Sequence, residues 1–359
     1  MKKVIWLGLI LIAVWAVSLK YDMKKPDADK KVIKIGVVLP LTGDAAHAGQ
    51  SMLSEFEVLK EDVAQRDLKN KYEFIIEDNV YDTKVTANIN SKLLGYDKVN
   101  AIIDLGSRIG YVTSTMVSKA EVIHFSACSG DARVSEGKYT FAYTLLPEEQ
   151  AELVANYAEG KYDNVAIVGL NEASSEVIIK ELKKEFDEKG IKYKEYYFNR
   201  SDRNIRDLIE KSRQENPDLY ILTLFSPSIE IFMKQFIEAG VKVQLASTHF
   251  LSTISDYGLI EGAWFSDYAD ADEGLRKRIV DKNNGEISEM CVGYIYDIAH
   301  TLIGAFEKTE SDEKAFEYLR NLQGWEGVTG KVENKGNGLF SAKPSLKKIE
   351  NGKMKVIEE

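Results

Sequence analysis

Cysteine and histidine, the residues that most often bind metals or form cross-links, are scarce in this chain of 359 residues. The two cysteines, Cys128 and Cys291, match no disulfide framework and no metal-binding spacing. None of the four histidines belongs to an HExxH motif or lies at a cysteine–histidine spacing. We therefore expect no metal site and two buried thiols, although a single disulfide between them stays open from the sequence.

Catalytic motifs are also missing from the sequence. It contains no P-loop, no GxGxxG after a strand and no GxSxG. The serine-rich stretch 126–129 could hold a nucleophile only beside a base, and the sequence shows none. We expect a binding protein without a cofactor rather than an enzyme.

Basic residues are fewer than acidic ones. The chain has 47 Lys and Arg against 57 Asp and Glu, a net charge of −10. This balance argues against non-specific binding to nucleic acid or to an anionic membrane surface. We therefore expect no nucleic acid partner; the charge says little about a ligand.

An apolar run, Val4–Leu19, stands near the N-terminus between Lys3 and Lys20. A basic start, an apolar stretch and small residues such as Ala16-Val17-Ser18 are typical of a signal peptide. An uncleaved membrane anchor is the alternative, since sixteen residues lie just below the length of a span. Both interpretations predict export to the periplasm or cell surface. The first 30 residues would then be a signal or anchor plus a charged tether.

Short β-branched runs alternate with helical patterns from residue 32 onward, and the alternation restarts after Pro147. Continuous apolar strands between amphipathic helices predict parallel sheets covered on both faces, and the length suggests about two domains of roughly 150 residues. The strands are expected at Val32–Leu39, Glu73–Glu77, Ala101–Leu105, Val122–Phe125, Val165–Gly169, Tyr193–Phe198 and Leu219–Phe225. The helices are expected at Ser51–Gln65, Lys84–Leu94, Gly110–Lys119, Ser175–Lys189, Asn204–Glu215, from Ser226-Pro227 to Gly240, and Glu289–Lys308.

Three small, polar loops follow strands of the first α/β unit: Leu41–Gln50, Gly106-Ser107 and Ser126–Gly130. In open parallel sheets, ligands bind beyond the carboxyl ends of the strands, where helix N-termini present free N–H groups. Each loop alone is compatible with ordinary turn chemistry. Together they indicate a ligand site at one edge of the sheet.

Six stretches, in this order over residues 31–357, carry a resemblance to a known family. The chain resembles the type I periplasmic binding proteins, and within them the branched-chain amino acid-binding (leucine-binding protein-like) family of ABC transporter substrate-binding proteins. The stretches are IKIGVVLPLTGDAAHAGQ, VNAIIDLGSR, VIHFSACSGD, NPDLYILTLFSPSIEIFMKQFIEAG, GYIYDIAHTLIGAF and WEGVTGKVENKGNG.

The resemblance implies two Rossmann-like, doubly wound lobes that are joined by three crossovers and close on a ligand. Lobe 1 would hold residues 31–144 and 268–328, and lobe 2 residues 145–267 and 329–359.

The resemblance also implies site residues. Ser107, after Gly106, matches the serine that holds the ligand's α-carboxylate, and Cys128, Ser129 and Gly130 fall on the second carboxylate-binding loop. Phe225 falls where lobe 2 offers an aromatic wall.

Other site positions depart from the family pattern. Ala48, beside His47, stands at the aromatic position of the first loop, and Ser174 stands in the lobe-2 pair that is usually Tyr-Gly. His249 falls near the acid that pairs with an α-ammonium group. An ammonium buried there without a carboxylate would be costly. An amino acid-like ligand, a carboxylate and an amide all stay open.

The expected function is an extracytoplasmic solute-binding protein that delivers its ligand to the permease subunits of an ABC importer. A membrane-tethered ligand-sensing module of the same fold, without a transport role, is the alternative. The remaining histidines, His124 on a strand and His300 on a helix, are expected to be structural.

Overall fold

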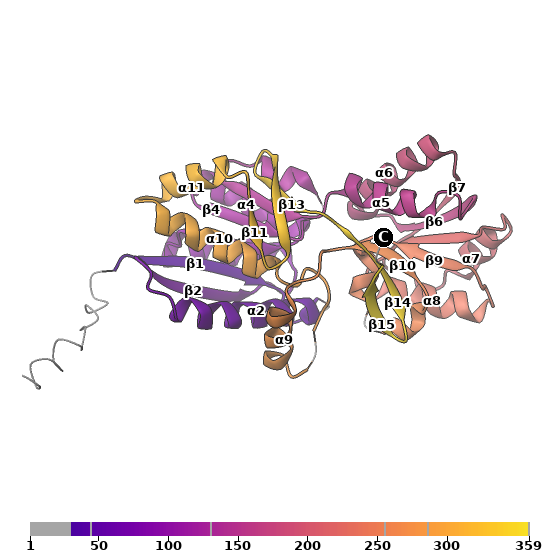
Figure 1. Cartoon of the computed structure of the whole chain (residues 1–359), viewed down its shortest axis with the longest axis horizontal. Coiled ribbons are helices and arrows are strands. Elements are labelled where there is room, and N and C mark those ends of the chain that lie inside the picture. Colours follow the sequence, from indigo (N-terminus) through magenta and orange to yellow (C-terminus); the bar gives the residue numbers. More distant parts are fainter. Residues whose placement is uncertain (1–29, 44, 130, 255, 286, 358–359) are drawn as a thin grey trace, which may run out of the picture.

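The computed structural model describes residues 30–357, except 44, 130, 255 and 286. It contains two α/β lobes, each built on its own sheet (Figure 1). The predicted signal peptide or anchor, residues 4–19, lies outside the described residues. Among the described helices, none combines the length and the apolar character that crossing a membrane requires.

Lobe 1 has a sheet of eight strands in the order β11-β12-β13-β5-β4-β3-β1-β2. Neighbours from β13 to β2 are parallel, while β11, β12 and β13 pair antiparallel. The strands are β1 (Val32–Leu39), β2 (Lys71–Asp78), β3 (Ala101–Leu105), β4 (Ile123–Ala127), β5 (Thr140–Thr144), β11 (Gly324–Gly327), β12 (Gly330–Gly336) and β13 (Leu339–Ala342).

Lobe 2 has a sheet of seven strands in the order β15-β14-β10-β9-β8-β6-β7. The run from β10 to β7 is parallel, and β14 and β15 pair antiparallel at its edge. The strands are β6 (Asn164–Leu170), β7 (Lys192–Phe198), β8 (Leu219–Thr223), β9 (Gln244–Ser247), β10 (Trp264–Asp267), β14 (Ser345–Glu350) and β15 (Lys353–Val356).

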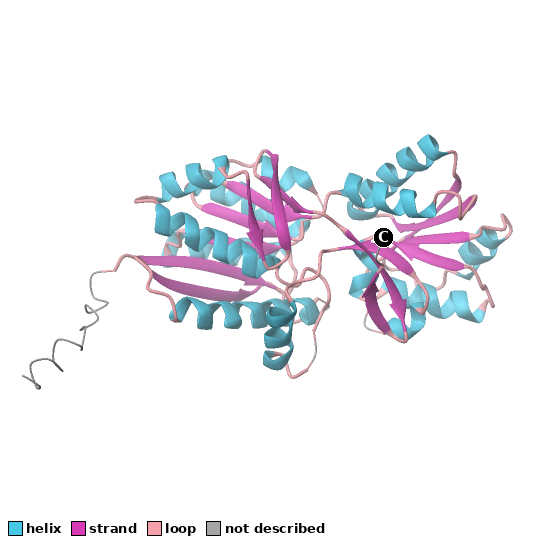
Figure 2. Ribbon diagram, viewed as in Figure 1, coloured by secondary structure: helices cyan, strands magenta, loops and turns pink. Residues whose placement is uncertain are grey.

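Helices cover both faces of each sheet, as Figure 2 shows. Successive strand residues therefore enter different cores: Val37 joins the core under α2 and α10, whereas Val38 joins the one under α4. The helices are α2 (Ala46–Ala64), α3 (Thr83–Lys92), α4 (Ser107–Ala120), α9 (Glu273–Lys282), α10 (Tyr294–Lys308) and α11 (Asp312–Asn321) in lobe 1, and α5 (Pro147–Ala158), α6 (Ala173–Lys189), α7 (Arg206–Arg213) and α8 (Ser228–Glu238) in lobe 2.

The predicted fold class is confirmed, with local differences. The helix expected over Glu289–Lys308 begins at Tyr294, because Cys291 and Gly293 both have positive φ and break a helical run. Strands β12 and β13, expected in lobe 2 as part of 329–359, pair with the lobe 1 sheet instead. The hairpin from β11 to β12 holds them there, so the chain changes lobe near residues 342–345.

The chain passes between the sheets three times: from β5 to α5, from β10 to α9 and from β13 to β14. Two crossovers are tied together by Lys347 of β14, whose Nζ lies 3.1 Å from Asp267 Oδ2 and 2.6 Å from Asp270 Oδ1. Ser345 Oγ also donates to the Tyr268 carbonyl at 3.2 Å.

Candidate functional site

The loops that follow β3 and β4 present hydroxyl groups at the carboxyl end of the lobe 1 sheet. Ser107, half-buried in the first turn of α4, accepts a hydrogen bond at Oγ from the Asp131 N–H at 3.1 Å. Ser129 is buried, and its Oγ accepts from Ser126 Oγ at 3.3 Å. Each hydroxyl accepts one bond and retains its own hydrogen, so each can donate to a carboxylate or carbonyl.

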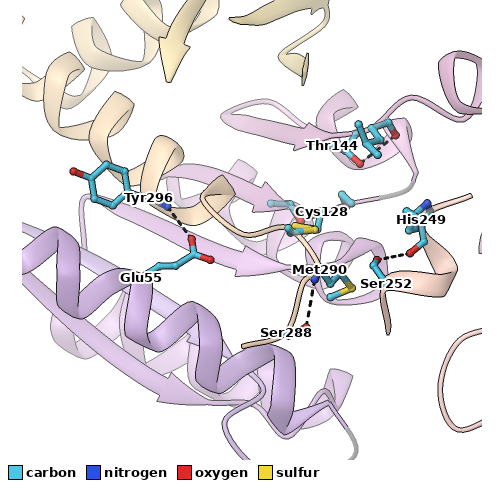
Figure 3. Close-up of a disulfide and its surroundings, with 12 residues drawn as sticks. Glu55, Cys128, Thr144, His249, Ser252, Ser288, Met290 and Tyr296 are labelled. Atoms are coloured by element: carbon cyan, nitrogen blue, oxygen red, sulfur yellow. Dashed lines mark hydrogen bonds between the residues drawn. A yellow bond between two sulfur atoms is a disulfide. The ribbon is translucent and has the colours of Figure 1, made fainter. Parts of the chain in front are cut away.

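A disulfide joins Cys128, in the loop after β4, to Cys291, just before α10. The expectation of two thiols is therefore wrong, because the fold brings residues 163 apart to a Cα–Cα distance of 6.3 Å. Figure 3 shows Met290 beside the disulfide, together with Ser252 and His249 of lobe 2. The disulfide therefore fixes the loop that carries Ser129 to the segment that precedes α10.

Tyr81, which follows β2, packs against Gly106 and Arg108 on the lobe 1 side of the site. A Cβ on Gly106 would lie 2.6 Å from the Tyr81 hydroxyl oxygen, and Gly106 has φ +82°, so only glycine fits there. Arg108 donates to the Tyr81 carbonyl, and its guanidinium carbon lies 4.6 Å from the centre of the Tyr81 ring. Gly106 thus lets Tyr81 approach the start of α4, with a cation stacked on its ring.

His249 occupies the end of the lobe 2 sheet, after β9, and is 8% exposed. Its Nδ1 lies 2.8 Å from Gln150 Oε1, which also accepts from the His249 N–H at 3.3 Å. Burial lowers the pKa of His249 to about 4, so the imidazole is neutral near pH 7. Phe225 and Phe250 flank its ring at centroid distances of 6.1 and 4.6 Å.

Glu172 and Arg200 form a charged pair at the lobe 2 side, after β6 and β7. Arg200 donates to both Glu172 oxygens, Nε to Oε1 at 2.6 Å and Nη2 to Oε2 at 2.8 Å. Arg200 lowers the pKa of the Glu172 carboxyl, and Arg108 of lobe 1 lowers it further. Burial raises the pKa of Tyr81, against the charges of Arg108 and Arg200.

Tyr268, in the second crossover, connects the two sides. Its ring lies 5.6 Å from the His249 ring and 4.9 Å from the ring of Tyr294 at the start of α10. The side chain of Thr144, where the first crossover begins, forms a hydrogen bond with the side chain of Tyr268. Ring contacts of Tyr268 therefore connect the imidazole of lobe 2 to the start of α10 in lobe 1.

A sequence model described as periplasmic binding protein matches residues 32–339, most of the chain. The chain belongs to this family. No curated protein sequence matches it. The family is periplasmic and extracytoplasmic, and its solute-binding members work with ABC transporters.

Solved periplasmic binding proteins share the fold over almost the whole chain. The leucine-binding protein LivK of Thermotoga maritima is 19% identical with a TM-score of 0.80, over 91% of this chain and 98% of that one. LivJ of Streptococcus pneumoniae, in complex with isoleucine, is 17% identical with a TM-score of 0.79, over 92% and 100%. A solute-binding protein of Rhodopseudomonas palustris in complex with 3,4-dihydroxybenzoic acid is 16% identical with a TM-score of 0.79, over 91% and 96%. At these identities the similarity shows the fold.

Within this periplasmic binding fold, the predicted site residues fall into two groups. The structure brings Gly106, Ser107, Cys128 and Ser129 together in lobe 1, and Phe225 and His249 together in lobe 2. Ser174 is half-buried in the first turn of α6. His47 is exposed and Ala48 half-buried on α2, and within the described part of the chain no side-chain hydrogen bond, ion pair or ring contact joins them to the others. Gly130 lies outside the described residues.

The two other histidines differ from each other. His124 is fully buried on β4, with Nε2 3.0 Å from Asp104 Oδ2, which agrees with a structural role. His300 lies on the exposed face of α10, a helix whose other face is buried in the core, and its ring is 6.3 Å from that of Tyr296.

Sequence reasoning missed Tyr81, Arg108, Glu172, Arg200 and Tyr268. Glu172 and Arg200 each stand just after a strand of lobe 2, the same signal that selected Ser107 in lobe 1. Applying that signal equally to both lobes would have found them. Tyr268 lies in a crossover, where no local pattern marks a site residue.

Proposed function

We propose that the chain is an extracytoplasmic solute-binding protein that captures a small polar ligand between its lobes and delivers it to an ABC importer. The proposal is supported by the position of Ser107 and Ser129 after strands of the lobe 1 sheet and of His249 after a strand of the lobe 2 sheet. These serines accept hydrogen bonds from their own lobe and keep hydroxyl hydrogens for a ligand. The role requires no covalent chemistry.

The anionic or carbonyl end of the ligand binds in lobe 1. Ser107 opens α4, so free N–H groups of its first turn point toward the same place as the serine hydroxyls. The other end of the ligand packs against Phe225, His249 and Tyr268. Closure of the lobes buries both ends, and the closed form then docks on the permease.

The family leaves the ligand class open. The Streptococcus pneumoniae neighbour holds isoleucine, whereas the Rhodopseudomonas palustris neighbour holds 3,4-dihydroxybenzoic acid. Both ligands carry a carboxylate, which agrees with an anionic end in lobe 1. They differ at the other end of the molecule, where this chain has His249.

A thermal-shift screen of the full chain tests the proposal. Amino acids, aromatic acids, 2-oxo acids, amides, polyamines and nucleobases are added in turn, and binding raises Tm by mass action. Native mass spectrometry of the purified protein checks for a ligand that remains bound. A reproducible shift with one class supports capture, and no shift together with no co-purified ligand contradicts it.

Uptake by cells separates transport from sensing. Deleting the gene should abolish uptake of the ligand that the screen identifies, and restoring it should recover uptake. A membrane-tethered sensor binds the same ligand but leaves uptake unchanged. Unchanged uptake would therefore contradict the transport role and retain the binding role.

A further inference from the structure

At the lobe 2 end of the site, His249 offers a hydrogen-bond acceptor, while the carboxylate of Glu172 is already paired with Arg200. Gln150 Oε1 accepts from the His249 backbone N–H, which orients the amide, so the same oxygen accepts from Nδ1–H. The neutral ring then has its lone pair on Nε2. An imidazole lone pair can accept a hydrogen bond, but it cannot neutralise a buried ammonium group.

The carboxylates around the site already have partners. Among the described residues, Asp78 accepts from Thr42 Oγ1, Asp104 lies beside His124, Asp131 pairs with Arg133, Glu172 with Arg200, and Asp267 with Lys347. Each would have to give up a partner to bind an ammonium group. Breaking such a pair leaves a charge without compensation, which is costly in a buried place.

Asp104 and Glu230 are the exceptions that the proposal has to meet. Asp104 is fully buried on β3, and although its Oδ2 lies 3.0 Å from His124 Nε2, neither carboxylate oxygen has a hydrogen-bond partner among the described residues. Glu230 Oε1 accepts from Ser226 Oγ at 2.8 Å, and its buried Oε2 has no partner among the described residues. It lies in the first turn of α8, where free N–H groups stabilise a carboxylate. Among the described residues, no hydrogen bond, ion pair or ring contact joins Glu230 to His249, Tyr268 or Ser107.

The lobe 1 end of the site carries positive charge. Arg108 follows Ser107 directly and stacks on Tyr81, and no carboxylate of the described residues lies within ion-pair distance of it. A cation beside two donor hydroxyls favours a carboxylate, through charge-assisted hydrogen bonds.

We infer that the ligand is a carboxylate without an α-ammonium group, such as a 2-oxo acid or an aromatic acid. Its carboxylate faces Ser107, Ser129 and Arg108, and its other end, apolar or carrying a hydrogen-bond donor, packs among His249, Phe225 and Tyr268. This inference rests on the proposed function and narrows its ligand class.

Matched ligand pairs test the inference, because each pair differs mainly in the ammonium group. The pairs are leucine and 4-methyl-2-oxopentanoate, phenylalanine and phenylpyruvate, and tyrosine and 4-hydroxyphenylpyruvate, with 4-hydroxybenzoate as an aromatic acid. Calorimetric titration of the full chain at pH 7 should give at least tenfold tighter binding for the 2-oxo acid of a pair. Equal or tighter binding of the amino acid overturns the inference.

Variants at His249 test whether this residue decides the preference between a 2-oxo acid and the corresponding amino acid. His249→Glu supplies the missing negative charge and should shift the preference at least tenfold toward the amino acid. His249→Gln, the matched neutral control, should keep the preference for the 2-oxo acid. Equal shifts in both variants would mean that size rather than charge matters, which contradicts the inference.

Glu230→Gln tests the exception at Glu230 directly. It should leave both affinities of each pair within about twofold of the parent values. If the parent binds amino acids and Glu230→Gln loses that binding, Glu230 is the ammonium partner and the inference fails while the proposed function stands. If no compound binds and no ligand co-purifies, the proposed function fails, and the inference with it.

Discussion

At the scale of single residues, Ser107 is prepared for a ligand by a bond inside its own lobe. Its Oγ accepts from the Asp131 N–H, and this bond orients the hydroxyl without using its hydrogen. Ser129 is placed in the same way by Ser126. Neither serine therefore donates its hydroxyl hydrogen within the protein, so each can donate it to a ligand carboxylate.

Ser107→Ala and Ser129→Ala should each weaken ligand binding by about 1–3 kcal/mol, because each leaves a buried ligand oxygen without a donor. Titration calorimetry with the ligand found by screening measures the loss. Ser91→Ala is the control, since Ser91 is exposed on α3 and bonds only to the Ala87 carbonyl of its own helix. Unchanged affinity in both site variants would contradict the site assignment and leave the fold untouched.

Glu55 makes stability depend on pH. It lies on α2, fully buried against the start of α10, and burial raises its pKa to about 8. The folded state therefore binds more protons than the unfolded state between about pH 4.5 and pH 8. Below that range the carboxyl of Glu55 does not change the free energy of unfolding. As pH rises through the range it lowers the free energy of unfolding increasingly, by up to on the order of 5 kcal/mol.

Glu55→Gln should remove this dependence. The variant stays neutral and keeps an oxygen for the Tyr296 N–H, so its stability relative to the parent should rise steadily from pH 5 to pH 8. Urea unfolding across this range measures the difference. Glu317→Gln, on the exposed face of α11, should track the parent at every pH. A constant difference between Glu55→Gln and the parent would show that Glu55 does not titrate there.

At the scale of elements, the sequence predicts long apolar strands well and short polar ones poorly. Val32–Leu39 and Ala101–Leu105 match their strands residue for residue, because both are buried on two faces and read as continuous apolar runs. The pattern specifies no strand at β5, β9 or β10, although these are short and largely buried, and no bounds for β11 to β15. Glycines or lysines interrupt β11, β12, β14 and β15, and the pairing of these strands is decided by distant segments. Tertiary pairing also moved β12 and β13 into lobe 1.

The candidate site shows the same division. A local rule, polar loops after buried strands, is enough to select Ser107 and Ser129. Arg108 acquires its place by stacking on Tyr81, which comes from a different loop, and Tyr268 by lying between the lobes. Such neighbours are set by packing across the sheet, and no short pattern in the sequence specifies them.

The Cys128–Cys291 disulfide connects the loop after β4 to the segment that precedes α10. It closes a loop of 163 residues, so breaking it frees much of the unfolded chain, at a typical cost of about 2–5 kcal/mol. Adding dithiothreitol should therefore lower Tm, and the double variant Cys128→Ser/Cys291→Ser should have a low Tm that reductant does not change. A parent Tm that is insensitive to reductant while both thiols react with a thiol reagent would contradict this prediction.

At the scale of the whole molecule, two of the three crossovers are joined by one buried cation. Lys347 is 3% exposed at its side chain, and its partner Asp267 is completely buried. Asp270 of the second crossover holds the same ammonium group. The pair therefore fixes how the second and third crossovers leave lobe 2, and with them the geometry about which the lobes close.

Lys347→Ala should destabilise the chain by about 3–5 kcal/mol, because it leaves Asp267 buried without a cation. Lys343→Ala is the matched control, since Lys343 is exposed in the third crossover itself and should change stability by less than about 0.5 kcal/mol. The double variant Lys347→Met/Asp267→Asn removes both charges and should recover most of the loss. Urea unfolding of the three variants decides the matter: if the double variant is no more stable than Lys347→Ala, the lysine acts through its packing and not through its charge.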